Sequence, residues 1–146
     1  MNKKHNYFYA LINGQETAIT ESQLTDLLSN AYYGIGFGYW GVSVHQNYLD
    51  ARTELFKEGI DEEDICREDV WARVLMKGQT IDVTEPEDDD AVHKISIKNI
   101  AEGLEQYFKE APANGCTDIE DLLYNGDSDD ADCVMQYATY GEIIFG

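Results

Sequence analysis

The 146-residue chain contains ten Tyr, five Phe and two Trp and carries a formal net charge of −19, and its aromatic content predicts one folded domain where the charge alone would favour disorder. So acidic a chain is not expected to bind nucleic acid directly, because binding to the phosphate backbone depends on Lys and Arg; its expected partners are basic proteins. No apolar run approaches the ~18 residues of a membrane span, no secretory signal is expected, and three widely spaced cysteines suit free thiols in the cytoplasm.

The chain begins with signals for a hairpin and a helix. Tyr7–Ile12 and Glu16–Ile19 are predicted strands, and the Asn-Gly pair between them is typical of a two-residue hairpin turn. A capping box over Thr20–Gln23 is followed by apolar residues at helical spacing. A helix is therefore predicted over Glu21–Tyr32.

Aromatic residues alternate with glycines from Tyr32 to Gly41. Large rings bury much area and glycines allow sharp turns, so the pattern predicts a chain reversal in the core with Trp40 buried. The alternative is an exposed platform of Tyr39 and Trp40 that stacks on a base or contacts a partner. A phosphate-binding loop is not predicted, because the glycines lead into a predicted strand, Trp40–His45, and not into a helix.

The middle of the chain predicts the main sheet. After a possible helix over Tyr48–Glu58, an antiparallel meander is expected over Val70–Met76, Thr80–Thr84 and Val92–Ile97. A charged loop, Glu85–Asp90, joins its last two strands. The fold class predicted for residues 1–146 is a single α+β domain with this meander packed against two to four helices.

Helical spacing dominates the last third of the chain. Ile97–Ala111 has the clearest amphipathic pattern, and this helix is expected to cover the meander with Leu104 and Phe108 buried. The remaining predicted elements are a short helix over Asp118–Tyr124, a final helix that Asp127 or Ser128 caps and Gly141 ends, and a docked strand over Glu142–Phe145.

Sequence motifs for catalysis or metal binding are weak. The histidines lack the spacing of zinc ligands, and no serine or cysteine stands in a nucleophile motif. Alternate positions from Asn125 resemble a calcium loop, but Asp130 stands where the turn needs Gly and Gln136 where a Glu is needed. An acidic pair such as Asp88-Asp89 suits a metal-dependent nuclease, yet positive surface for its substrate is lacking. We therefore expect no catalytic residues, no metal and no cofactor.

Acidic residues form two dense clusters, and from Glu110 to Gly146 the chain has nine acidic residues and no Lys or Arg. Carboxylates three or four residues apart on a helix lie about 5–6 Å apart, a spacing comparable to that of phosphates along a nucleic-acid strand. Such a face is predicted to imitate a nucleic-acid backbone; a merely solvated surface is the alternative. The expected contact residues are Glu87, Asp88, Asp89 and Asp90 in the charged loop, and Asp127, Asp129, Asp130 and Asp132, facing solvent at the start of the final helix.

Three features of the chain are distinctive: a helix leading into the Tyr-Trp box at Gly38–Gly41, a strand leading into the Ile97–Ala111 helix, and the ending Asp129–Gly146. Together they resemble a group of small acidic proteins encoded in phages and prophages of Gram-positive bacteria. The resemblance implies no reaction. Related members commonly carry a cysteine after the Tyr-Trp pair, where this chain has Gly41, so no thiol role is implied there. As a class, small acidic phage proteins without catalytic motifs are similar to DNA mimics that block CRISPR effectors or restriction enzymes.

The expected function is a non-enzymatic, phage-encoded inhibitor. Its acidic surface would block a basic, nucleic-acid-binding defence protein in the cytoplasm of the host bacterium, by anti-CRISPR or anti-restriction action. One alternative is a prophage accessory or assembly protein whose acidity only aids solubility. A second is a metal-dependent or small-molecule enzyme, with the aromatic-glycine stretch as a pocket wall.

Overall fold

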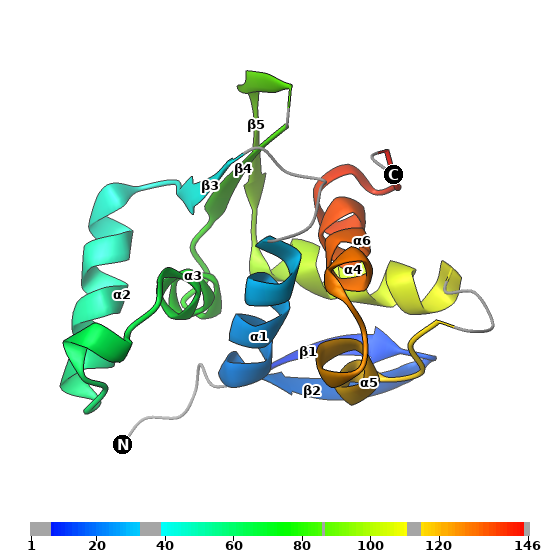
Figure 1. Cartoon of the computed structure of the whole chain (residues 1–146), viewed down its shortest axis with the longest axis horizontal. Coiled ribbons are helices and arrows are strands. Elements are labelled where there is room, and N and C mark those ends of the chain that lie inside the picture. Colours follow the sequence, from blue (N-terminus) through cyan, green and yellow to red (C-terminus); the bar gives the residue numbers. More distant parts are fainter. Residues whose placement is uncertain (1–6, 33–38, 86, 111–114, 145–146) are drawn as a thin grey trace.

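Helices lie between two small antiparallel sheets (Figure 1). The computed structural model describes residues 7–32, 39–85, 87–110 and 115–144. The fold is α+β, as predicted, but the described residues form six α-helices where two to four were expected. In chain order the elements are β1 (Tyr7–Ile12), β2 (Gln15–Thr20), α1 (Glu21–Tyr32), β3 (Tyr39–Val42), α2 (His45–Lys57), a 3-10 turn (Glu62–Asp64), α3 (Arg67–Met76), β4 (Ile81–Glu85), β5 (Asp88–Ile95), α4 (Ile97–Glu110), α5 (Ile119–Tyr124) and α6 (Ser128–Tyr140).

The opening hairpin and first helix form as predicted. β1 pairs with β2 around Asn13 and Gly14, whose φ angles of 55° and 81° are those of a turn that matches the twist of the strands. At the start of α1, the Thr20 N–H donates to Gln23 Oε1 over 2.9 Å and the Gln23 N–H donates to Thr20 Oγ1 over 3.1 Å. The capping box is therefore present at the predicted residues.

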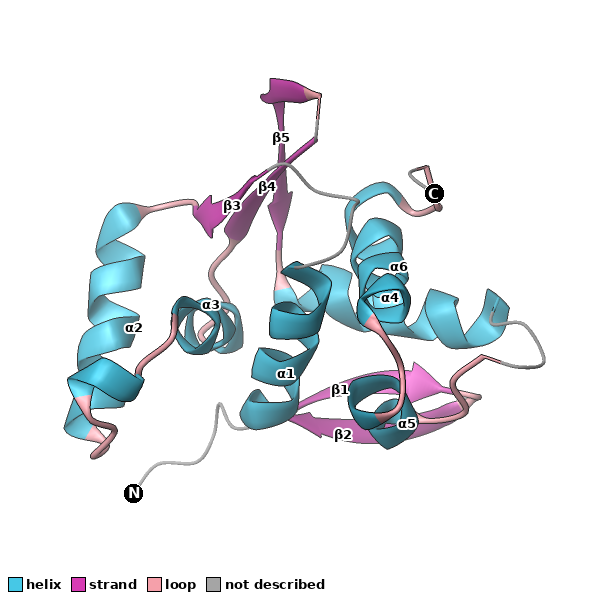
Figure 2. Ribbon diagram, viewed as in Figure 1, coloured by secondary structure: helices cyan, strands magenta, loops and turns pink. Residues whose placement is uncertain are grey.

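Helix α4 covers this hairpin and not the three-stranded sheet. One face of β1 is apolar and buried, and α4 packs on β1 and on α6. Leu104 and Phe108 are buried, which confirms the predicted apolar face. The prediction that this helix covers the meander is wrong, because alternate apolar side chains give the opening hairpin a face of its own that needs a helix above it. Figure 2 shows the two sheets on opposite sides of α1, α4 and α6.

The second sheet has the strand order β3-β4-β5, with both pairings antiparallel. Trp40 stands opposite Val83, and Ile81 opposite Ile95, and all four side chains are buried. The predicted strand Thr80–Thr84 is thus present within one residue, and the predicted strand Val92–Ile97 is present but begins four residues earlier and ends two residues earlier. The sheet's third strand is β3, from the aromatic stretch.

The predicted strand Val70–Met76 is wrong, because these residues belong to helix α3. α3 packs against α1 and α2, and almost every one of its residues after Arg67 is buried. Burial on all sides removes the polar face that marks a helix in a sequence, and the run of apolar, β-branched and aromatic residues then resembles a strand. The start of the helix gives only a weak local signal in the sequence. There the Cys66 N–H donates to the Asp69 carboxylate over 3.0 Å.

The ends of two elements, near α2 and β5, differ from the predicted ones. The strand predicted over Trp40–His45 ends at Val42, because Val44 is the N-cap of α2 and is 53% exposed. The charged loop is shorter than predicted, since Asp88 already pairs with Glu85. Helix α2 is confirmed, and Gly59 follows it with a φ of 100°.

The final helix carries the predicted caps, and α5 begins with an aspartate cap that was not predicted. Asp118 accepts the Asp121 N–H at the start of α5, and Asp127 accepts the N–H groups of Asp129 and Asp130 at the start of α6. Gly141 ends α6 with a φ of 77°.

The predicted terminal strand is wrong in its described part. Residues 142–144 are not in a strand, and the Ile144 N–H instead donates to the Gln136 side chain on α6 over 2.9 Å. Phe145 lies outside the described residues.

Candidate functional site

The two predicted acidic clusters lie apart in the structure. Glu87, Asp88 and Asp90 are exposed at the tip of the β4–β5 hairpin, whereas α5 lies on the opposite side of the molecule (Figure 1). The prediction for the side chain of Asp89 lies outside the described residues. The hairpin tip and the α5–α6 region therefore form separate surfaces.

Asp132 is not a surface residue, which corrects the prediction that it faces solvent. Its exposed fraction is 3%, and it accepts a 2.7 Å hydrogen bond from the Gln136 side chain, which is also buried. Both residues stand on the face of α6 that turns toward the core, together with Met135. Asp132 therefore takes part in packing and not in a surface contact.

Asp130 is half-buried, and its carboxylate accepts hydrogen bonds from within the fold. Its carboxylate accepts the Tyr107 hydroxyl over 2.9 Å and the Asp127 N–H over 3.2 Å. Burial first, and then the neighbouring Cys116 and Asp130, raise the pKa of Tyr107 well above its usual range. This hydrogen bond joins α4 to the start of α6.

One group of exposed and half-buried carboxylates lies around α5 and the start of α6. We name as the α5–α6 acidic face the residues Asp26, Asp118, Glu120, Asp121, Asp127 and Asp129. The Tyr124 hydroxyl donates to Asp26 on α1 over 3.4 Å, and the charge of Asp26, together with that of Glu120, raises the pKa of this tyrosine. Helices α1 and α5 therefore share one negative surface.

A hollow of about 440 Å³ lies on this face, lined by Asp118, Glu120, Asp121 and the exposed ring of Tyr124. The Thr117 N–H donates to Asp121 over 2.9 Å, and this bond holds the pKa of the Asp121 carboxyl below its usual value. The Asp121 carboxylate is therefore charged at neutral pH and partly fixed in position.

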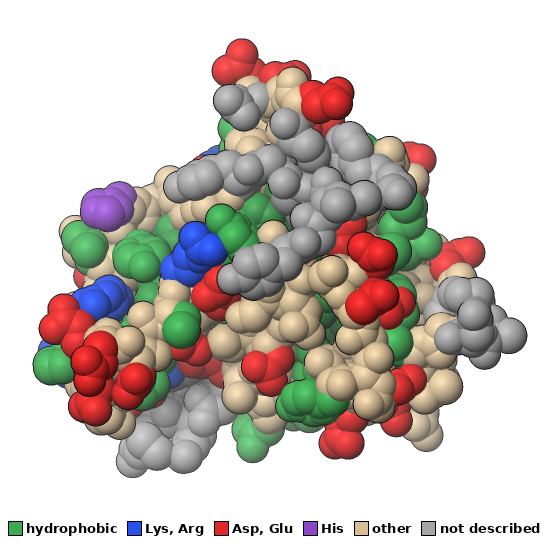
Figure 3. Space-filling view, viewed as in Figure 1, with side chains coloured by type: hydrophobic (Ala, Val, Ile, Leu, Met, Phe, Trp, Pro, Cys, Tyr) green, Lys and Arg blue, Asp and Glu red, His purple; other side chains and the backbone are tan. Residues whose placement is uncertain are grey.

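The basic side chains that form ion pairs lie elsewhere in the chain. Among the described residues, every ion pair joins partners between Glu21 and Lys94, so none involves the carboxylates of α5 or α6. In Figure 3 the prominent blue side chains lie over α2 and α3, and red carboxylates mark the hairpin tip, the side of α5 and α6, and the lower end of α2. The α5–α6 acidic face thus keeps its charge.

Trp40 is buried, which confirms its predicted place in the core. Its exposed fraction is 3%, and its ring centroid lies 5.7 Å from that of Tyr32 and 5.6 Å from that of Trp71. A fully exposed platform on Trp40 is therefore wrong, and the prediction for the Tyr39 side chain lies outside the described residues.

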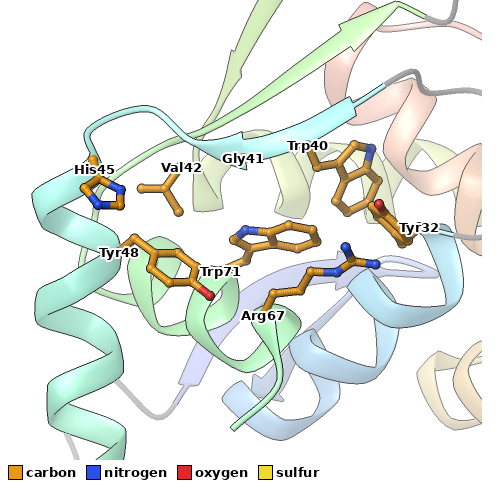
Figure 4. Close-up of a pocket in the computed structure, with 8 residues that line it drawn as sticks. All are labelled: Tyr32, Trp40, Gly41, Val42, His45, Tyr48, Arg67 and Trp71. Atoms are coloured by element: carbon orange, nitrogen blue, oxygen red, sulfur yellow. The ribbon is translucent and has the colours of Figure 1, made fainter.

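The three rings border a cavity of about 320 Å³, which we name the aromatic pocket. Tyr32 ends α1, Trp40 lies in β3 and Trp71 in α3, while Tyr48 and His45 come from the first turn of α2 (Figure 4). The guanidinium carbon of Arg67 stands 4.0 Å from the centroid of the Tyr32 ring and 5.6 Å from that of Trp71. The pocket therefore combines aromatic walls with a cation at its edge.

Sequence reasoning found one wall of this pocket and missed the rest. The aromatic-glycine stretch pointed to Trp40, but Trp71 was predicted in the strand Val70–Met76 and Arg67 lay before that strand, whereas both belong to helix α3. As a helix, α3 brings Arg67 and Trp71 onto one face because they are four residues apart. Had that helix been predicted, its spacing would have placed Arg67 and Trp71 together.

Other reactive groups do not assemble into a site in the described part of the chain. Its histidines, cysteines and carboxylates form no group of three or more that is arranged to hold a metal ion. The three cysteines are free thiols, and burial raises the pKa of Cys66, Cys116 and Cys133, which makes each less reactive. None of the described helices is long and apolar enough to cross a membrane.

A scan of protein-family models, a search of curated proteins and a search of solved structures found no match to this chain.

Proposed function

We propose that this protein is a non-enzymatic inhibitor whose α5–α6 acidic face occupies the nucleic-acid site of a basic partner. The observation that carries the proposal is the concentration of exposed carboxylates around a hollow, in a part of the chain that contains no Lys or Arg after Lys109. Gathering like charges costs folding free energy through self-repulsion, and a basic partner offsets that cost on binding.

The geometry of the carboxylates supports mimicry over simple solvation. Asp118 and Asp127 are helix caps held by backbone N–H groups, so their charges have fixed positions. Asp121 is likewise held by Thr117. Charges that are fixed before binding lose less entropy when a partner's arginines and lysines contact them.

The partner is a basic protein that binds nucleic acid, and the resemblance to phage and prophage proteins supports a host defence protein. The proposed setting is the cytoplasm of an infected Gram-positive bacterium, and the proposed action is anti-CRISPR or anti-restriction. A prophage accessory protein with a solvated surface is the competing function. It predicts no partner that DNA displaces.

A capture experiment identifies the partner. Tagged protein is incubated with a lysate of phage-infected host cells, with and without nuclease, and the bound proteins are identified by mass spectrometry. The proposal expects a basic nucleic-acid-binding protein that is retained after nuclease treatment, is displaced by added DNA and binds more weakly as salt rises. Recovery of only phage structural proteins, unaffected by DNA, would support the accessory function instead.

Matched charge variants test the location of the surface. The face variant is Asp26→Asn, Glu120→Gln, Asp129→Asn, and the control is Glu87→Gln, Asp88→Asn, Asp90→Asn at the hairpin tip; each removes three charges. Competition with labelled DNA for the captured partner should weaken in the face variant, mainly through slower association and with a shallower salt dependence. Equal effects of the two variants would show that total charge, and not this face, drives binding.

A further inference from the structure

The aromatic pocket is a second site that the acidic-face proposal does not use. We propose that it binds a small, uncharged, planar heteroaromatic molecule of the nucleobase or nucleoside type, stacked against one ring of its aromatic wall and hydrogen-bonded by Arg67. The inference is independent of the proposed function, because the pocket is formed by α1, β3, α2 and α3, whereas the acidic face is centred on α5 and the start of α6.

The walls of the pocket favour a flat ring. Tyr32, Trp40 and Trp71 lie with their ring centroids 5.6–5.7 Å apart, and Trp71 is tilted by 43° to each of the other two rings. Tyr48 closes the side toward α2 (Figure 4). Aromatic faces at several angles give a flat guest one stacking partner and edge contacts from the others.

The size of the cavity limits the guest. A volume of about 320 Å³ lies near the lower end of the ~300–1,000 Å³ range of small-molecule sites. This accommodates one bicyclic ring with a small substituent such as a ribose. A dinucleotide or a folded peptide segment is too large.

Arg67 provides recognition at the edge of the pocket. Its Nε donates to Glu68 over 3.2 Å, and its guanidinium lies over the Tyr32 ring, so the orientation of the planar group is defined from two sides. A planar array of N–H donors matches the carbonyl oxygens and ring nitrogens of a heteroaromatic base. A saturated or purely hydrocarbon ring lacks such acceptors.

The charges in and around the pocket favour an uncharged guest. A cationic guest is disfavoured because Arg67 already lies on the aromatic face, and its charge repels a second cation. A polyphosphate is disfavoured because Glu68 partly neutralises Arg67 and the chain carries a net charge of −19. The uncharged base or nucleoside is therefore preferred over its nucleotide.

Intrinsic fluorescence gives a direct test, because the chain has two Trp residues and both Trp40 and Trp71 line the pocket. The full chain is titrated with adenosine, guanosine, cytidine and uridine, and in parallel with AMP and with benzyl alcohol. The proposal expects saturable quenching by at least one nucleoside, at least about tenfold weaker binding of AMP and of benzyl alcohol, and little change with salt. No saturable response to any nucleoside, or benzyl alcohol binding as tightly as the nucleosides, would overturn it.

A pair of arginine variants tests the role of Arg67. Arg67 has a side chain 46% exposed, so Arg67→Ala should leave the fold intact, as circular dichroism can verify. The matched control is Arg52→Ala on α2, whose side chain is 36% exposed and pairs with Glu62 outside the pocket. Nucleoside affinity should fall about tenfold or more in Arg67→Ala and stay unchanged in Arg52→Ala. Equal affinity in the two variants would refute recognition by Arg67.

Discussion

Two aspartates of α6 show how position decides the role of an identical side chain. Asp129 is exposed in the first helical turn, whereas Asp132, three residues later, is buried against Gln136. Asp132→Ala leaves the Gln136 amide without this acceptor, so we expect a loss of about 1–3 kcal/mol of unfolding free energy. Asp129→Ala should cost less than about 1 kcal/mol, the usual size of a charge effect at a helix N-terminus. Urea unfolding of both variants measures the difference, and equal losses would contradict the assignment.

Gly103 permits the close approach of α4 and α6. A Cβ at this position would lie 2.5 Å from the Val134 carbonyl oxygen and 2.9 Å from the Ala138 Cβ. Alanine improves helix propensity by about 1 kcal/mol over glycine, but the two helices must separate to accept the methyl group, which costs about 1–3 kcal/mol and often more. We expect Gly103→Ala to be destabilising overall.

Thermal or urea unfolding of Gly103→Ala provides the measurement. Glu102→Ala at the neighbouring exposed position of α4 is the control, and it should change stability by less than about 0.5 kcal/mol. A stabilised Gly103→Ala protein would show that α4 and α6 are not in contact at this residue.

At the scale of elements, Arg73 joins three helices. Its side chain is 3% exposed and contacts Glu21 on α1 at 2.9 Å, Glu58 after α2 at 2.7 Å and Glu54 on α2 at 3.3 Å. The hydrogen bonds to Glu58 raise the pKa of Arg73 further above its usual range. Because α3 lies between α1 and α2 (Figure 1), this one guanidinium links α3 to both neighbouring helices.

Removing that guanidinium should loosen the α1–α3–α2 layer. Arg73→Ala removes the cation that Glu21 and Glu58 share, while Glu54 keeps only its pair with Lys77, and we expect a loss of about 3–5 kcal/mol. Arg52→Ala breaks an exposed pair with Glu62 and should cost no more than about 1 kcal/mol. Chemical denaturation compares the two variants, and a similar small loss in both would mean that Arg73 is not a structural link.

For the whole molecule, the net charge of −19 predicts that salt stabilises the fold. Like charges repel in the folded state, and the Debye length falls from about 10 Å at 0.1 M salt to about 3 Å at 1 M. The midpoint of thermal unfolding should therefore rise when sodium chloride is added. Sodium thiocyanate at low concentration serves as the control, since screening acts with either anion. A midpoint that falls with both salts would show that ion pairs such as those of Arg73 outweigh the repulsion.

Local patterns in the sequence were sufficient for elements whose signals lie within a few residues. The Asn-Gly turn, the Thr20–Gln23 capping box, the amphipathic spacing of α4 and the caps of α6 each rest on neighbouring side chains and backbone groups, and all are confirmed. The α+β class follows from these elements. The burial of Trp40 also followed from its type and from the glycines around it.

Tertiary structure alone decided the rest, because burial depends on residues distant in the chain. α3 was predicted as a strand since packing between α1 and α2 removes its polar face, and that error concealed Arg67 and Trp71 as walls of the aromatic pocket. Likewise, the acidic pattern at the start of α6 could not separate exposed Asp129 from buried Asp132. A sequence fixes spacing along an element, whereas only the packed neighbours determine which side of that element meets solvent.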